Sequence, residues 1–235
     1  MSKLEIIEIS KLPKKKLTLI TGFAGVGFIG NTVLMHMAHT KGLRQIAYLH
    51  GDIIPPLMVF YEGKPRPCFR IYTDASEEFL LMITEALISS EAAWIIGKEL
   101  MKWLSNTELK EIIAIDGVPL SQMGKNIFGF TTGSRDLPNY GIQNLPSGAI
   151  SGINAAMLYE AEKKNIAWTS IFIPSQIISG TDYQGAVIAI NLLNKMFNLN
   201  IDSEQLQRIS DITLRAETKR RQEKKGGFLN RIFPG

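Results

Sequence analysis

Short runs of β-branched and aliphatic residues alternate along the chain with longer segments whose apolar residues recur every three to four positions. The short runs are typical of β-strands, and the longer segments are typical of amphipathic helices. This alternation predicts an α/β domain in which helices cover a sheet. The predicted strands are residues 4–9, 17–21, 45–49, 57–61, 68–72, 79–84, 111–115, 127–131 and 167–173. The predicted helices are residues 26–41, 90–105, 151–164, 183–197 and 203–220.

One pair of the predicted strands is expected to form an antiparallel hairpin. Residues 57–61 and 68–72 flank Gly63 and Lys64, which are placed as a turn between them. Because this antiparallel pair would join a sheet built otherwise from strand-helix units, the sheet is expected to be mixed. The expected fold class is α/β, a three-layer αβα sandwich with a mixed sheet.

The ends of three predicted helices carry residues suited to capping. Ser151, Asp182 and Asp202 are placed as N-caps because their side-chain oxygens can accept hydrogen bonds from first-turn N–H groups. Asp202 is followed three residues later by Gln205, the spacing of a capping box. Helical apolar spacing in the last helix stops near Ala216. We therefore expect one domain over residues 1–218, followed by a flexible, glycine-containing tail over 219–235.

Charge is concentrated near that tail. Residues 215–231 hold seven Lys/Arg and two Glu, a net charge of +5, whereas the whole chain carries +4. The remaining residues together are therefore close to neutral. Since nucleic-acid binding generally needs Lys and Arg spread over a folded face, this distribution argues against a nucleic-acid partner. A nucleic-acid accessory bound through the tail is kept as a weaker alternative.

Composition and hydropathy narrow the class of protein. Hydrophobic residues make up 45% of the chain, enough for a continuous core. Cys68 is the only cysteine, which suits a reducing cytosol and excludes a cysteine-rich metal site. No run approaches the roughly 18 apolar residues of a membrane span, and residues 4–9 do not resemble a signal peptide. We expect a cytoplasmic protein with no membrane partner.

A glycine-rich loop offers one candidate for small-molecule binding. Gly25, Gly27 and Gly30 fit the GxGxxG pattern between a predicted strand and a predicted helix, and Asp52 follows at a distance suited to a ribose hydroxyl. However, the predicted hairpin follows where a dinucleotide domain would continue with parallel units. The alternative interpretation is that the glycines let the first helix pack closely on the sheet.

The other candidate residues do not form a recognisable catalytic set. His36 and His39 have a spacing that could serve a metal, but no third ligand is apparent. Ser151 lacks the spacing of a nucleophile elbow. We therefore predict no enzyme, cofactor or metal. The alternative is a binding protein or enzyme for a phosphate, nucleoside or nucleotide that uses the loop from Gly22 to Gly30 with Asp116, Arg135 and Asn154.

Several motifs together resemble the proteasome assembly chaperone family, in the branch of its second eukaryotic member with archaeal and bacterial homologues. Each motif is unspecific alone, but their order and spacing over about 200 residues are more specific. The matching segments are residues 21–27 (TGFAGVG), 112–119 (IIAIDGVP), 148–154 (GAISGIN), 182–186 (DYQGA) and 199–202 (LNID).

The resemblance implies a fold similar to purine nucleoside phosphorylases, a homo-oligomer and no established catalytic residues. It therefore favours a chaperone-like binding protein. Some archaeal members end in a hydrophobic-tyrosine-any tripeptide that docks between α subunits of the 20S proteasome. Here the ending is Phe233-Pro234-Gly235, so Ile232-Phe233-Pro234 has the hydrophobic-aromatic-any order one residue early. The added glycine would displace the carboxylate by up to about 3.5 Å relative to the ring.

The tail is expected to have an apolar tip that contacts a partner. Phe228, Leu229, Ile232 and Phe233 are spaced to share one side of a helical turn, after the charged segment. A tethered tip raises its own local concentration near a partner. We predict partner contacts at residues 228, 229 and 232–235, with proteasome α subunits as the partner. The alternative is that the tip packs on its own body or on a neighbouring subunit.

Overall fold

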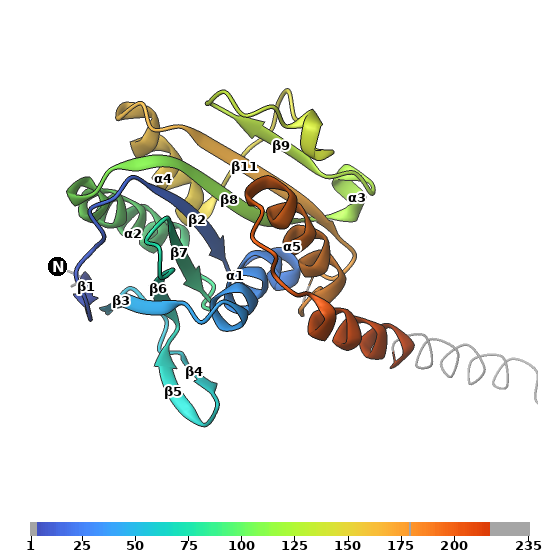
Figure 1. Cartoon of the computed structure of the whole chain (residues 1–235), viewed down its shortest axis with the longest axis horizontal. Helices are drawn as coiled ribbons and strands as arrows, with labels where there is room; N and C mark the ends of the chain where they lie inside the picture. Colours follow the sequence, from blue (N-terminus) through green and yellow to red (C-terminus); the bar gives the residue numbers. More distant parts are fainter. Residues whose placement is uncertain (1–3, 179, 217–235) are drawn as a thin grey trace, which may run out of the picture.

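The computed structural model describes residues 4–178 and 180–216. Its main feature is one mixed sheet of nine strands in the order β1-β3-β6-β7-β2-β8-β11-β9-β10 (Figure 1). The strands are β1 (Leu4–Glu8), β2 (Leu17–Phe23), β3 (Arg44–Gly51), β6 (Phe69–Thr73), β7 (Phe79–Thr84), β8 (Leu109–Pro119), β9 (Phe128–Thr131), β10 (Gln143–Asn144) and β11 (Trp168–Ser175). Strands β7, β2, β8 and β11 run parallel to their neighbours within this group.

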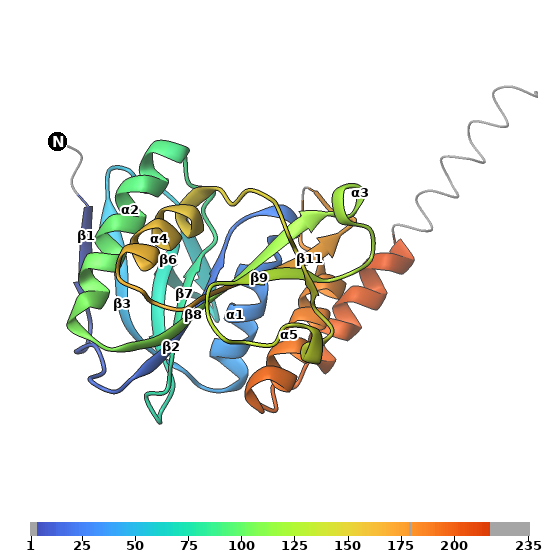
Figure 2. The same cartoon turned by 90° about the horizontal axis from the view of Figure 1, so that it is seen from above.

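Helices cover both faces of the sheet, as Figure 2 shows. Helices α1 (Ile29–Thr40) and α5 (Tyr183–Phe197) pack on one face, and α2 (Ser90–Trp103) and α4 (Gly152–Lys163) pack on the other. Shorter helical turns are η1 (Val26–Phe28), η2 (Leu104–Asn106), α3 (Leu120–Met123) and η3 (Pro138–Tyr140). The predicted three-layer αβα sandwich with a mixed sheet is confirmed.

The two cores follow from the alternation of side chains along each strand. On β2, Leu19 points into the core beneath α2 and α4, whereas Ile20 points into the core beneath α1 and α5. On β8, Ile112 and Ile113 divide in the same way. Because both faces are covered, the central strands are apolar over most of their length, which explains why the sequence shows them as short hydrophobic runs.

The hairpin prediction is correct in kind but wrong in its second strand. Strand β4 (Met58–Tyr61) pairs with β5 (Lys64–Pro67), and residues 69–73 instead enter the main sheet as β6. Glu62 and Gly63 both have positive φ, so the turn is a tight two-residue connection. A two-residue turn pairs Tyr61 directly with Lys64, so the second strand begins at Lys64. The predicted second strand, residues 68–72, lies too far along the chain to pair across this turn. The hairpin projects from the body as an arm (Figure 1).

The predicted helix caps have different outcomes. The Asp182 carboxylate accepts a hydrogen bond from the Gly185 N–H at 2.8 Å, which confirms this cap. Ser151 precedes α4 in an extended conformation but makes no side-chain cap hydrogen bond. Asp202 accepts a hydrogen bond from the Glu204 N–H at 2.9 Å, and residues 204–216 are helical. That helix therefore starts one residue later than predicted.

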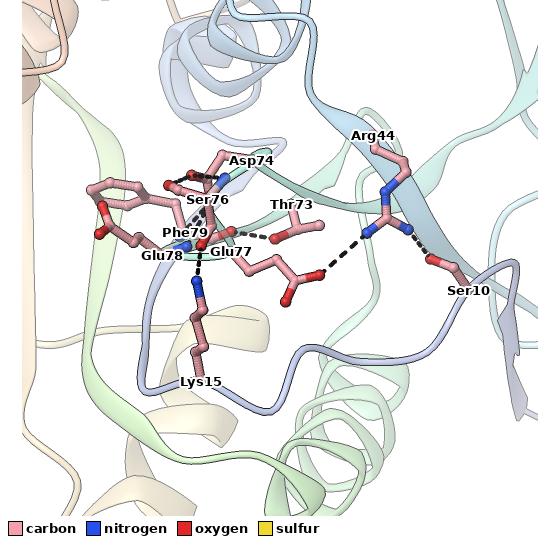
Figure 3. Close-up of polar contacts among 9 residues, drawn as sticks. All are labelled: Ser10, Lys15, Arg44, Thr73, Asp74, Ser76, Glu77, Glu78 and Phe79. Atoms are coloured by element: carbon pink, nitrogen blue, oxygen red, sulfur yellow. Dashed lines mark hydrogen bonds and ion pairs between the residues drawn. The ribbon is translucent and has the colours of Figure 1, made fainter.

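The connection from β6 to β7 is fastened at the amino end of β7 (Figure 3). The Asp74 carboxylate accepts hydrogen bonds from the backbone N–H groups of Glu78 and Phe79, at 2.9 and 2.7 Å. The Lys15 ammonium donates to the Ser76 carbonyl oxygen at 2.9 Å. The acceptors here are satisfied within the loop and by the segment before β2. These contacts fasten the amino ends of the parallel strands β2 and β7 to the segments that precede them.

Candidate functional site

A cavity of about 310 Å³ lies where the central parallel strands end. It is bounded by the ends of β2 and β7, by β8 beyond its middle, and by the start of α4. The carboxyl ends of parallel strands are where open α/β sheets commonly bind ligands. Its lining residues are Phe23, Ala24, Gly25, Val26, Thr84, Ala86, Leu87, Ile88, Asp116, Gly117, Val118, Ala149, Ile150, Ser151, Gly152, Ile153, Asn154 and Phe172.

A chain of three polar side chains runs from the core to this cavity. The Thr21 hydroxyl donates to the Asn154 amide oxygen at 2.8 Å, and the Asn154 amide nitrogen donates to the Asp116 carboxylate at 2.9 Å. Thr21 and Asn154 are buried, and Asp116 is partly buried. Since the hydroxyl donates to the amide oxygen, the amide nitrogen faces the carboxylate. The chain holds Asp116 in one orientation at the cavity wall.

Burial controls the protonation of Asp116. It raises the pKa of this carboxyl from 3.8 to about 6, against the lowering effect of the hydrogen bond from Asn154. The group is thus mainly ionised at neutral pH and titrates just below it. A carboxyl with so displaced a pKa at the wall of a cavity is typical of a functional site.

The glycines of the loop serve mainly to pack α1 against the sheet. A Cβ at Gly30 would lie 2.3 Å from the Ile115 carbonyl oxygen, and one at Gly22 would lie 2.2 Å from the Gly30 carbonyl oxygen. Gly27 has a φ of +63°, and a Cβ there would lie 2.6 Å from the Ser175 hydroxyl. Gly25 differs, because its Cβ would meet no atom closer than 4.0 Å. Only Gly25 of the GxGxxG glycines lines the cavity.

The structure divides the residues proposed for phosphate or nucleoside binding. Asp116 and Asn154 meet beside Gly25, as that set requires. Arg135 does not join them, because its guanidinium pairs with Glu111, five residues before Asp116 on β8. At about 3.3 Å per strand residue, this places the pair roughly 17 Å along the strand. The inclusion of Arg135 in the site is therefore wrong.

Asp52 is also remote from the glycine-rich loop. It is exposed and follows β3, which is separated from β2 by strands β6 and β7. Three strand spacings of about 4.8 Å amount to roughly 14 Å. Asp52 therefore cannot contact a ribose held at the loop, and the dinucleotide interpretation fails in its geometry.

The two histidines of α1 are engaged by different segments. The His36 ring hydrogen-bonds to the Asp202 carbonyl oxygen, whereas the His39 ring stacks on Tyr61 of the arm, with centroids 3.5 Å apart. Burial, with Arg66 nearby, lowers the pKa of His39. Within residues 4–178 and 180–216, no group of three or more His, Cys, Asp or Glu is arranged to hold a metal ion.

A second, larger cavity adjoins the first and has no counterpart in the sequence-based predictions. Its volume is about 540 Å³, and it lies between the 145–150 segment and α4. It shares Ala149, Ile150 and Phe172 with the first cavity, so the 149–150 segment separates the two. The sequence Pro146-Ser147-Gly148 predicts a loop. It does not predict that a cavity separates this loop from α4.

Some predictions lie outside the described residues. These include the tail over 219–235 and its proposed contact residues Phe228, Leu229, Ile232, Phe233, Pro234 and Gly235. In the described part of the chain, every helix is too short or too polar to cross a membrane.

The sheet order, the two helical layers and the glycine-rich turn define a three-layer α/β protein. Within that class, the sequence profile of the PAC2 family matches residues 19–219, and the chain therefore belongs to this family. This membership confirms the resemblance to proteasome assembly chaperones that the sequence motifs indicate.

Solved structures and a curated sequence extend the comparison. PbaA of Pyrococcus furiosus, described as an archaeal homolog of proteasome-assembly chaperone, has a TM-score of 0.80 and 22% identity over 97% of this chain and 94% of its own. PbaB of the same organism, described as an archaeal proteasome activator, has a TM-score of 0.80 and 15% identity over 93% of this chain and 99% of its own. An uncharacterised protein of Methanocaldococcus jannaschii is 23% identical over 209 residues, 88% of this chain and 86% of that protein.

Proposed function

We propose that the protein is a non-enzymatic binding protein that acts on the proteasome during its assembly or activation, as a homo-oligomer in the cytoplasm. The observation that carries this proposal is the PAC2 family match over residues 19–219. The fold likeness to PbaA and PbaB over nearly the whole chain supports it, because those proteins are described as a chaperone homolog and an activator of this machine.

The side chains of the candidate site support binding rather than catalysis. Asp116 and Asn154 line the cavity, but no lining residue is a histidine, cysteine or lysine that would complete a common acid-base or nucleophilic set. Apolar side chains are also exposed on the arm, where Phe60 is 72% exposed and Met58 is 51% exposed. Exposed apolar clusters of this kind are typical of protein contact surfaces.

The tail is the proposed contact with proteasome α subunits. Removing residues 228–235 should abolish binding to purified α subunits, because the truncation ending at Gly227 deletes every apolar side chain of the tip. Phe233→Ala should weaken binding at least tenfold, since a buried aromatic anchor commonly contributes more than about 1.4 kcal/mol. Biolayer interferometry on the full chain and these variants measures both effects.

Asn230→Ala is the matched control, because it shortens a polar side chain within the same tip. It should bind as the unaltered chain does. Binding that persists after truncation would refute the role of the tail but not the partner. If the full chain shows no binding and leaves proteasome assembly and peptidase activity unchanged, the proposed function itself is wrong.

The arm is the proposed contact between copies of the chain. Phe60→Ser should lower the mass measured by light scattering, because a 72% exposed phenylalanine contributes little to the monomer and much to an interface that buries it. Lys64→Ser, an exposed change on the same arm, should leave the mass unchanged. A chain that is monomeric at all concentrations would contradict homo-oligomerisation. An oligomer whose mass is the same in Phe60→Ser would show that the interface lies outside the arm.

A small-molecule function remains the second candidate, and the cavity beside Asp116 favours it. The class of ligand differs, however, from the phosphate or nucleotide considered from the sequence. A phosphate would meet the Asp116 carboxylate without a lysine, arginine or histidine among the lining residues to offset its charge. The geometry therefore disfavours the phosphate version of the site.

A further inference from the structure

We propose that the cavity between β2, β7, β8 and α4 binds a small organic ammonium ion, with its cationic nitrogen on Asp116 and its apolar body against the surrounding walls. This inference goes beyond the proposed function and does not depend on a proteasome partner. It rests on the charge, the hydrogen-bond polarity and the shape of the cavity.

Asp116 gives the cavity a negative charge, and none of the lining residues is a lysine, arginine or histidine. Asp116 is the one ionisable residue among these lining residues, all of which lie in the described part of the chain. An ionised carboxylate that has been partly removed from water is stabilised by a cation placed beside it. An ammonium ion would supply that charge, whereas an anionic ligand would add to the repulsion.

The hydrogen bonds at Asp116 also favour a cationic ligand. Asn154 donates to one carboxylate oxygen of Asp116 and is itself held by the Thr21 hydroxyl. Because the carboxylate only accepts hydrogen bonds when ionised, a ligand that approaches it must donate. An ammonium group has donors and no acceptor, so it meets this requirement without leaving a buried acceptor unpaired.

Apolar side chains form part of the remaining wall, together with the polar residues Thr84 and Ser151. Phe23 and Phe172 contribute aromatic surface, and Val26, Ile88 and Ile153 contribute aliphatic surface. The volume of about 310 Å³ lies near the lower end of the range for small-molecule sites. We therefore expect an amine that carries one small aromatic ring or branched chain rather than a polyamine or a nucleotide.

The titration of Asp116 adds a testable consequence. Its pKa is raised to about 6 by burial, and a bound cation would lower it again by favouring the ionised form. Affinity should therefore fall by up to tenfold per pH unit below about 6, as a proton competes for the carboxylate. None of the other residues that line the cavity, on β2, β7, α4 or the connecting segments, carries a titratable side chain, so the pH dependence would report on Asp116.

The experiment compares probes of equal shape and different charge by titration calorimetry at pH 7.5. Benzylamine, cyclohexylamine and isoamylamine are each paired with the alcohol and the carboxylic acid of the same skeleton. At least one amine should bind, more tightly than its alcohol and its acid. If none of the amines binds better than its alcohol at millimolar concentration, or if an acid binds best, the proposal is wrong.

Three variants locate the binding. Asp116→Asn should weaken amine binding at least tenfold and raise the midpoint of thermal unfolding at pH 7.5, since it removes a partly buried charge at nearly constant shape. Asp52→Asn removes one exposed charge away from the cavity and should bind normally. Gly25→Val should also block binding by filling open space. Unchanged affinity in Asp116→Asn and Gly25→Val would place the amine elsewhere and overturn the assignment.

A further measurement separates this inference from the proposed function: the binding of the Asp116→Asn variant to proteasome α subunits. The variant should keep that binding, because the cavity and the tail are different parts of the chain. Loss of amine binding with retained proteasome binding supports both proposals independently.

Discussion

Replacing Gly30 with alanine should lower the free energy of unfolding by about 3 kcal/mol, the upper part of the usual cost of overpacking a core. The added Cβ would lie 2.3 Å from the Ile115 carbonyl oxygen and 3.0 Å from the Gly22 Cα. Both obstacles are backbone atoms, so neither can move without separating α1 from the sheet. Helix propensity alone predicts the opposite sign, because alanine is favoured over glycine in a helix by about 1 kcal/mol. The clash is the larger effect.

Gly25→Ala is the matched control for this prediction. Its Cβ would meet no atom closer than 4.0 Å, and its φ of −162° is extended backbone that any residue adopts. Stability should stay the same or increase by up to about 1 kcal/mol, because alanine restricts the unfolded chain. Urea unfolding followed by circular dichroism measures both variants. Equal stability of the two would mean that the glycines do not set the distance between α1 and β8.

Replacing Arg70 with methionine should destabilise the protein by about 3–5 kcal/mol, the usual cost of removing one partner of a buried ion pair. The Arg70 side chain is 1% exposed and pairs with Glu85, whose side chain is 17% exposed. Arg70 also donates to the Tyr72 hydroxyl at 2.9 Å and to the Pro67 carbonyl oxygen. Methionine preserves much of the volume but leaves the Glu85 carboxylate buried without its cation.

The loss caused by Arg70→Met should depend on pH. Burial already raises the pKa of Glu85, and Arg70 opposes that rise. Without Arg70 the folded-state pKa would move further above the unfolded value, so the folded protein would bind the proton more tightly. The penalty is therefore fully present above the folded-state pKa and decreases as the pH falls through it. Unfolding measured at pH 8 and pH 5 should show the larger loss at pH 8.

Two controls accompany the Arg70 variant. The double variant Arg70→Met with Glu85→Leu should recover most of the stability, because replacing both charges removes the unpaired carboxylate. Arg208→Met breaks an ion pair whose side chains are 72% and 66% exposed, and it should cause no measurable loss. A pH-independent loss in Arg70→Met would show that packing, rather than charge, is the function of Arg70.

Local patterns along the chain were sufficient for most of the elements and for the layers. Strands such as β2 and β7 are buried on both faces and so appear as predominantly apolar runs. The Asp182 cap was predictable because its carboxylate and the Gly185 N–H lie three residues apart. The close packing of α1 was predictable as an alternative, since glycines at a strand-helix turn serve packing as readily as they serve a ligand.

Contacts between distant segments had to come from the tertiary structure. Asp116 and Asn154 meet because β8 ends where α4 begins, although 38 residues separate them. Arg135 was grouped with them because its loop follows a predicted strand. In the structure its guanidinium pairs with Glu111, near the start of β8 and five residues before Asp116. The two-residue turn at Glu62 and Gly63 decided which strand pairs with β4, because sequence periodicity alone does not specify strand register.

The sequence by itself therefore determined the α/β class, the main helices and strands and the family resemblance, because these depend on spacing within short segments and on the order of motifs. The tertiary structure alone decided which candidate residues share a site. It separated Gly25, which faces open space, from Gly22 and Gly30, which face backbone. It also joined Asp116 to Asn154 and Thr21, since chain folding sets the distances between residues that are remote in sequence.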